Sequence, residues 1–181
     1  MGMPSMKTWS FAQRDLVTIA DALDIAEDSI GNYFQLSNEQ WKRIPYEIKT
    51  LASLSHDEIT SAAFALLNKG FKKLEDFHLA RERLDVYFIC LQDHLILQAL
   101  KRDKGLTLLP LLVYIFAHEL VHIVRFSQFI QRFDAMGEGR EKEEGFVHAK
   151  TFEILNKVSL PNLDYVLEAY RVHGVCEARP I

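Results

Sequence analysis

Apolar positions in the N-terminal third of the chain recur with the spacing of helices. From about Phe11 to Ile25 this spacing predicts a first helix. A second helix is expected to start near Ser37, where Gln40 completes a capping box, and Pro45 limits its length. The beginning of the chain is therefore expected to be helical.

A third helix is predicted in the same part of the chain. The sequence Ser55-His56-Asp57-Glu58 has the capping-box pattern and precedes the segment ITSAAFALLNK. Gly70 then offers a stop, because glycine readily adopts the left-handed conformation that ends many helices.

The pattern changes near residues 84–97. The segment DVYFICL is rich in β-branched and aromatic residues, which predicts a strand. Gln92 and Asp93 are polar and are expected at a turn or bulge before HLILQ. We therefore expect one strand or a short hairpin here, although a buried helix of this length would have a similar sequence.

The second half of the chain again predicts helices. Pro110 falls in the first turn of a long helix, where its missing N–H costs nothing. The segments expected here are a loop at Lys101–Gly105, this long helix to about Ala135, a helix over about Glu141–Val158 and a last helix over about Leu163–His173. The fold class predicted is mainly α, within α+β, as one domain over residues 1–181. It would divide into a helical part at 1–80 and a metal-binding core at 81–181.

Composition and charge exclude several classes of function. The 21 basic and 25 acidic side chains leave a net charge of −4 without a basic cluster, so no nucleic acid partner is expected. The apolar stretch at residues 106–117 is shorter than the roughly 20 residues of a membrane span, so we expect a buried core helix and no membrane partner. The first residues lack the apolar segment of a signal peptide, which favours a cytoplasmic location.

The long helix contains the pattern His118-Glu119-Leu120-Val121-His122. Residues four apart lie on one face of a helix, so His118 and His122 can bind one ion. Zinc takes imidazole nitrogens, and a catalytic zinc site has three protein ligands and a position for water. Glu119 is offset by about 100° around the helix, which suits a base that acts on that water. The pattern predicts a Zn²⁺ site with Glu119 as general base.

The third ligand must come from elsewhere in the chain. The metzincin pattern would place glycine and histidine where this chain has Arg125 and Gln128. The next helix offers Glu143, Glu144 and His148 in its first turns. Either Glu144 binds the metal and His148 hydrogen-bonds a ligand, or His148 binds and Glu144 orients it. The sequence context and the spacing of Glu144 favour it as the ligand.

These motifs resemble the gluzincin metallopeptidases, the group similar to thermolysin and aminopeptidase N. Those enzymes combine HExxH with a glutamate ligand on a following helix, and Glu144-Gly145-Phe146-Val147 is similar to their aminopeptidase N-E-G-F-A segment. The resemblance covers about residues 111–153 and places Glu144 at the ligand position. It implies a zincin-like domain in which the metal helix packs on the helix that follows. The G-x-M-E-N motif of the aminopeptidases is absent from the sequence.

The function expected is that of a zinc-dependent metallohydrolase, most simply a peptidase acting on an unidentified peptide or amide. One alternative is a non-hydrolytic protein of the di-iron or di-manganese carboxylate type, which would draw on ligands from four helices. Another is a zincin-like domain whose metal is structural, although such a site has no need of Glu119.

Several residues are candidates for supporting roles. An oxyanion-stabilising side chain would complete the site, and the terminal helix offers Tyr165, Tyr170 and His173. Arg125 is expected to form an ion pair with Glu143 or Glu144 that ties two helices together, and the alternative is a contact with a substrate carboxylate. The strand near residues 84–97 could bind an extended peptide along its edge. Asp93 and His94 could form a second polar cluster.

Overall fold

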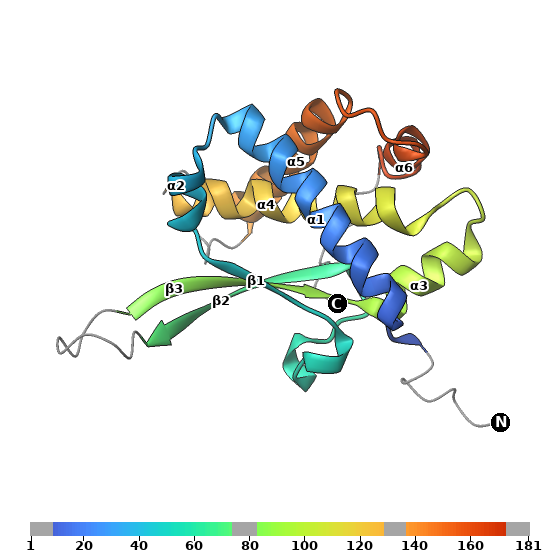
Figure 1. Cartoon of the computed structure of the whole chain (residues 1–181), viewed down its shortest axis with the longest axis horizontal. Coiled ribbons are helices and arrows are strands. Elements are labelled where there is room, and N and C mark those ends of the chain that lie inside the picture. Colours follow the sequence, from blue (N-terminus) through green and yellow to red (C-terminus); the bar gives the residue numbers. More distant parts are fainter. Residues whose placement is uncertain (1–8, 74–82, 129–136, 173–181) are drawn as a thin grey trace.

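The computed structural model describes residues 9–73, 83–128 and 137–172. It has an α+β architecture in which helices cover one face of a small sheet (Figure 1). The helices are α1 (Gln13–Phe34), α2 (Asn38–Lys42), α3 (Asp93–Arg102), α4 (Leu108–Ser127), α5 (Glu138–Leu155) and α6 (Leu163–Ala169). The strands are β1 (Tyr46–Lys49), β2 (Ala65–Lys73) and β3 (Arg83–Leu91).

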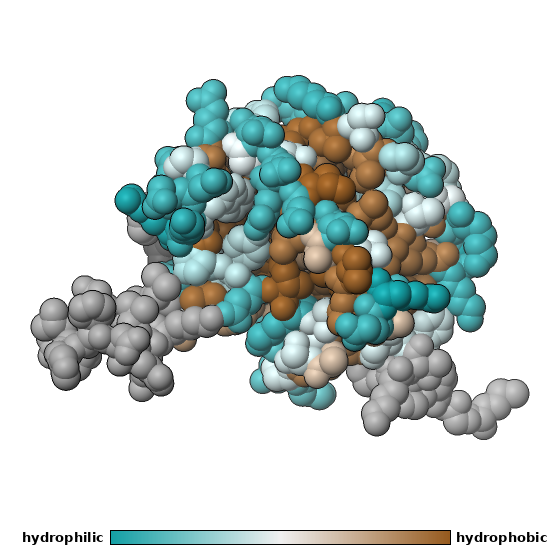
Figure 2. Space-filling model, in the orientation of Figure 1, coloured by the Kyte–Doolittle hydropathy of each residue, from teal (hydrophilic) through white to brown (hydrophobic). Residues whose placement is uncertain are grey.

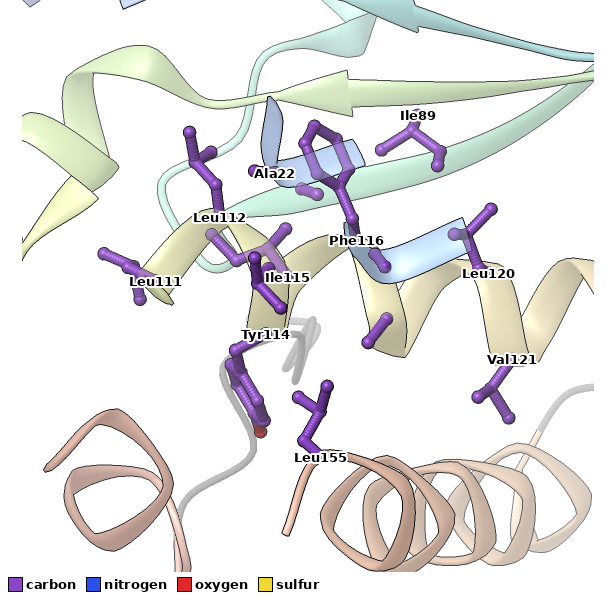
Figure 3. Packing of buried hydrophobic residues seen from close by; sticks show 14 of the residues in the cluster. Ala22, Ile89, Leu111, Leu112, Tyr114, Ile115, Phe116, Leu120, Val121 and Leu155 are labelled. Carbon is purple, nitrogen blue, oxygen red and sulfur yellow. The ribbon is translucent and has the colours of Figure 1, made fainter. Parts of the chain in front are cut away.

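The long helix α4 forms the centre of the fold. Every residue from Pro110 to Val124 is buried, which explains why this helix is apolar on all sides. Its neighbours are α1, α5, α6 and the sheet. Figure 3 shows Phe116 directed toward Ile89 of β3, while Tyr114 points to the side where α5 carries Leu155. The residues of the metal-binding pattern therefore lie on a helix that tertiary packing holds on several sides.

The helix α1 packs closely against α4. Ala22 and Ala26 are fully buried on the face of α1 that enters the core, and Ile30 is buried one turn further on. Small side chains let two helices approach closely. The opposite face carries charged residues, although apolar side chains also reach the surface on this side of the molecule (Figure 2). Leu16 and Val17 of α1 are among the exposed apolar residues.

The sheet has the order β1-β3-β2, with β3 in the middle. β1 runs parallel to β3, with Tyr46 opposite Tyr87, and β2 runs antiparallel to β3, with Ala65 opposite Leu91. The predicted strand is therefore confirmed at Arg83–Leu91. Because β3 has a partner strand on each side, the expectation that its edge is open to an extended peptide is wrong. The edges of this sheet are β1 and β2.

The prediction of a helix after Ser55 is wrong. The capping box forms, with the Ser55 N–H donating to Glu58 Oε2 at 2.9 Å, but only a 3₁₀ turn follows, at His56–Glu58. The chain then enters β2, which pairs with β3 over nine residues. A capping box fixes one turn only, and a short helix is marginal without packing, so the long pairing with β3 decides the conformation. Gly70 lies inside β2 and does not end a helix.

The expectation that a strand or hairpin continues through HLILQ is also wrong, because this segment forms α3. Gln92 and Asp93, predicted at a turn, separate β3 from α3. The buried Gln92 side chain accepts from the Thr60 N–H at 3.0 Å and donates to the Glu58 carbonyl at 2.8 Å. These bonds end the strand and tie the preceding loop to it.

The other helices form where they are predicted, but their bounds differ. The first helix, predicted over about Phe11 to Ile25, spans Gln13–Phe34 and so ends nine residues later. The Ser37 capping box begins α2 as expected, and Pro45 precedes β1. α5 begins three residues before its predicted start, and α4 ends at Ser127. α4 and α6 thus end at Ser127 and Ala169, before the predicted ends near Ala135 and His173. Positions 135 and 173 themselves lie outside the described residues.

The expected division at residue 80 does not match the sheet. β1 and β2 belong to the part predicted to be helical, and both pair with β3 from the second part. The N-terminal part is therefore mixed and not wholly helical.

One described helix, α4, is long and apolar enough to cross a membrane by length and composition. Most of it (83%) is buried inside the protein, as in the core helix of a globular fold. This burial agrees with the expected core helix.

Candidate metal centre

Two histidines of α4 point to the same side of the helix. His118 and His122 are one turn apart, and their ring centroids lie 4.9 Å from each other. Both are buried, with exposed fractions of 1% and 5%. The spacing predicted from the sequence thus produces two neighbouring imidazoles inside the protein.

The helix α5 brings a carboxylate to these two rings. Glu144 Oε2 lies 3.3 Å from His118 Nε2, and Glu144 Oε1 lies 3.3 Å from His122 Nε2. One ligand atom from each residue can be chosen so that all three lie within 4.8 Å of one another. The Glu144 side chain is 27% exposed, so the group is open to solvent at this residue. The structure therefore brings together His118, His122 and Glu144, three of the residues predicted as ligands.

The hydrogen bonding of these histidines is incomplete. Among the described residues, neither ring nitrogen of His118 makes a well-formed hydrogen bond, although Glu144 Oε2 lies 3.3 Å from Nε2, and His122 Nδ1 makes none either. Buried polar atoms without partners are rare in folded proteins and cost free energy. A metal ion that takes the Nε2 atoms would satisfy one nitrogen of each ring. Two imidazoles and one carboxylate are also a suitable set for zinc, with room for a water molecule.

The charges in the site are strongly coupled. Burial lowers the pKa of His122, but the Glu143 and Glu144 carboxylates outweigh this effect and raise it to about 9. Burial likewise favours protonated Glu144, yet the contacts with His118 and His122 hold its pKa well below the ordinary value. The site therefore concentrates negative charge around two nitrogens, as a site for a divalent cation does.

Glu119, the predicted general base, lies beside His118 on α4. It is buried, with an exposed fraction of 3%, and its charge is one of those that raise the pKa of His122. Within the described part of the chain its carboxylate is not held in an ion pair with Lys or Arg. A buried carboxylate next to the ligand group is suitably placed to accept a proton there.

The predicted ion pair of Arg125 is confirmed, and its partner is Glu143. Arg125 Nε donates to Glu143 Oε1 at 2.7 Å, and Nη2 donates to Oε2 at 2.8 Å. The guanidinium also lies over the ring of Phe146, with its carbon 3.9 Å from the ring centroid. This two-bonded pair joins α4 to α5 next to the ligands and fixes the relative position of the two helices.

Glu143 was not predicted to touch a ligand. Its Oε1 lies 3.7 Å from His122 Nδ1, on the side of the ring away from Glu144. The sequence contains the relevant signal, since Arg125 is three residues after His122 and so shares its face of α4. A partner of Arg125 on the next helix would then lie close to His122 as well.

His148, the other candidate for third ligand, is not in the ligand group. Its Nδ1 lies 3.4 Å from the Tyr114 hydroxyl, and its Nε2 lies 3.0 Å from the Arg171 carbonyl oxygen. Its ring packs against Phe152, with centroids 4.7 Å apart. Both ring nitrogens are thus directed to other partners, and the geometry favours Glu144.

The candidates for an oxyanion-stabilising residue have different surroundings. The Tyr165 hydroxyl donates to the Asp103 carboxylate, whose oxygens lie 2.9 and 3.1 Å away. Tyr170 stacks on Tyr114, with ring centroids 5.9 Å apart, and burial raises its pKa. His173 lies outside the described residues. These contacts of Tyr165 and Tyr170 are with Asp103 and Tyr114, and not with His118, His122 or Glu144.

Asp93 and His94 serve the fold and do not form a second site. Asp93 accepts hydrogen bonds from the N–H groups of Phe11 and Leu51, at 3.0 and 2.9 Å. His94 Nε2 lies 3.1 Å from the Thr60 carbonyl oxygen. These contacts hold three separate segments at the start of α3.

Comparisons with protein-family models, with curated proteins and with solved structures found no match to this chain.

Proposed function

We propose that this protein is a zinc-dependent metallohydrolase that cleaves an amide bond, with a zincin-like metal centre similar to that of the gluzincin peptidases. The observation that carries the proposal is the convergence of the Nε2 atoms of His118 and His122 on the two oxygens of Glu144. The hydrogen-bond capacity left unused on the buried imidazoles supports an ion at that point.

Each residue of the site has a separate task in this proposal. His118, His122 and Glu144 would hold the ion. When bound, zinc supplies a Lewis acid that makes water acidic near neutral pH and polarises a carbonyl group. Glu119 would accept the proton of the attacking water at a carboxylate oxygen and then donate it to the leaving amine nitrogen.

A site with two metal ions has less support. Among the described residues, one group of three convergent His, Cys, Asp or Glu side chains occurs, that of His118, His122 and Glu144. Both oxygens of Glu143 bond to Arg125, so this carboxylate is not free to bridge to a second ion. A purely structural metal would leave the buried Glu119 without a role.

The test combines metal content with one substitution. Purified protein should contain about one zinc per chain, and it should hydrolyse fluorescently labelled casein or a mixed peptide library. Glu119→Gln keeps the size of the side chain but removes the base, so it should keep its zinc and lose activity by about 10²–10⁴-fold. Two irons or manganese ions per chain would favour the carboxylate alternative, and equal turnover by Glu119→Gln would contradict the proposed mechanism.

A matched control is available on the next helix. Glu138 lies at the first position of α5 with a side chain that is 91% exposed, and Glu138→Gln removes the same charge away from the ligands. This variant should keep both zinc and activity.

A further inference from the structure

His122 lies between two carboxylates that occupy opposite sides of its ring. Glu144 Oε1 is 3.3 Å from Nε2, and Glu143 Oε1 is 3.7 Å from Nδ1. Both His122 and Glu143 are buried, with exposed fractions of 5% and 6%. The two nitrogens of this ring therefore have different surroundings, and the difference suggests different tasks.

Glu143 cannot serve as a ligand in this arrangement, because Arg125 holds both of its oxygens. The two bonds, at 2.7 and 2.8 Å, use the fork of the guanidinium and fix the plane of the carboxylate. Phe146 covers the guanidinium on one face. Phe146 thus packs on Arg125, and Arg125 holds Glu143. The position of the Glu143 oxygen that faces His122 is therefore fixed by these contacts.

We propose that Glu143, held by Arg125, is a positioning residue that fixes the tautomer and ring orientation of His122. This inference rests on the proposed metal centre. When Nε2 gives its lone pair to an ion, Nδ1 carries the proton and donates it toward Glu143 Oε1. A hydrogen bond to a charged acceptor is about 2.7–2.9 Å long, so the two groups must approach by about 1 Å when the ion binds.

The same support does not exist for the other histidine. Among the described residues, neither Nδ1 atom makes a hydrogen bond, but a carboxylate oxygen faces His122 Nδ1 at 3.7 Å and none is seen near His118 Nδ1. Histidines that bind metals usually donate the second ring N–H to a carboxylate, a carbonyl or water, and removal of that acceptor lowers metal affinity by about 10–100-fold. Glu143 therefore makes His122 the better oriented of the two imidazoles.

The first test measures metal affinity. Zinc affinity would be determined by competition with a chromophoric chelator for the full chain, for Glu143→Gln and for the control Glu138→Gln. We expect Glu143→Gln to bind zinc about 10–100-fold more weakly, and Glu138→Gln to equal the unmodified chain. Thermal unfolding of each metal-free protein shows whether the fold is kept.

A second measurement separates positioning from general stabilisation. The visible spectrum of the Co²⁺-loaded protein reports the geometry around the ion. It should change in Glu143→Gln, and it should recover in part in Glu143→Asp, which restores the charge with a shorter reach. Equal zinc affinity and an unchanged Co²⁺ spectrum in Glu143→Gln would overturn the inference.

A third measurement needs no substitution, so it holds even if Glu143→Gln fails to fold. In the zinc-loaded protein labelled with ¹⁵N-histidine, His122 should carry its proton on Nδ1 and bind through Nε2. Coordination through Nδ1 would overturn the role of Glu143. If the unmodified chain binds neither zinc nor Co²⁺, the proposed metal centre itself is wrong, and this outcome is distinct from a failure of the positioning role alone.

Discussion

Glu144 Oε1 lies 3.3 Å from His122 Nε2, although 21 residues separate the two in the sequence. The contact joins the first half of α5 to the second half of α4. It completes a group of three candidate ligand atoms, two from α4 and one from α5.

This relationship predicts which residue binds the metal. Glu144→Ala should weaken zinc binding by more than about 100-fold, because it removes a ligand. The loss of a supporting hydrogen bond alone would weaken binding by about 10–100-fold. His148→Ala should bind zinc as the unmodified chain does, since the His148 ring contacts Tyr114 and the Arg171 carbonyl. Competition with a chromophoric chelator measures both. A larger loss in His148→Ala than in Glu144→Ala would reverse the assignment.

Gly105 is predicted to leave room for the ring of Tyr165, which packs against its backbone. A Cβ at Gly105 would lie 2.3 Å from Tyr165 Cζ, so the ring would have to move and its bonds to Asp103 would be lost. Gly105→Ala should therefore lower the free energy of unfolding by about 0.5–1.5 kcal/mol, the net contribution of the lost hydrogen bond, because the exposed ring can move away. Urea denaturation of the metal-free protein measures the change.

Gly145 provides the opposite case for comparison. It lies within α5, and an added Cβ would meet nothing within 4 Å. Gly145→Ala should raise the free energy of unfolding by about 0.5–1 kcal/mol, because alanine favours the helix. If Gly105→Ala is also stabilising, the packing of Tyr165 against this backbone is not as the structure has it.

Asp93 is predicted to stabilise the junction of three segments. Its buried carboxylate accepts the N–H groups of Phe11 and Leu51, and alanine would leave both donors without this acceptor. Asp93→Ala should lower the free energy of unfolding by about 2–6 kcal/mol, from about 1–3 kcal/mol for each of the two donors left without a partner. Asp164→Ala, on the exposed side of α6, is the control and should change it by less than about 0.5 kcal/mol. Equal stability of the two variants would contradict the role of Asp93.

Cys90 is predicted to react slowly with thiol reagents. Burial in β3 raises the pKa of this thiol to about 11, from an ordinary value of 9.0. At pH 8 the thiolate fraction is then lower by about 100-fold than for an ordinary thiol, and the rate should rise with pH toward 11. The rate can be measured with a disulfide reagent in a Cys176→Ser background, where Cys90 is the one remaining thiol, before and after unfolding in urea. Rapid reaction of the folded protein at pH 8 would contradict the burial of this residue.

The local signals in the sequence led to the correct elements where neighbouring residues decide the structure. The spacing of His118 and His122, the position of Pro110 and the capping box at Ser37 each act within one or two turns. Helix periodicity therefore predicted α4 and the face that carries both imidazoles. The order of the residues in α5, through its resemblance to a known pattern, also pointed to Glu144, which the structure places beside both imidazoles.

The local signals failed where a distant segment decides the structure. The segment after Ser55 has the composition of a helix but forms β2, because β3 offers nine residues for pairing. HLILQ has the composition of a strand but forms α3, because the buried side chains of Gln92 and Asp93 bond to residues at 58–60, 11 and 51. Neither partner can be identified from the residues next to these segments.

The sequence by itself determined two imidazoles and a glutamate on one helix, since the geometry of a helix follows from bonds between residues four apart. Only the tertiary structure decided which oxygens approach those nitrogens. The packing of α5 on α4 places the Glu144 carboxylate beside the Nε2 atoms of His118 and His122. It also pairs Glu143 with Arg125 and directs His148 toward Tyr114. A shift of one residue along a helix rotates a side chain by about 100°, so the assignment of these three neighbours depends on how the two helices meet.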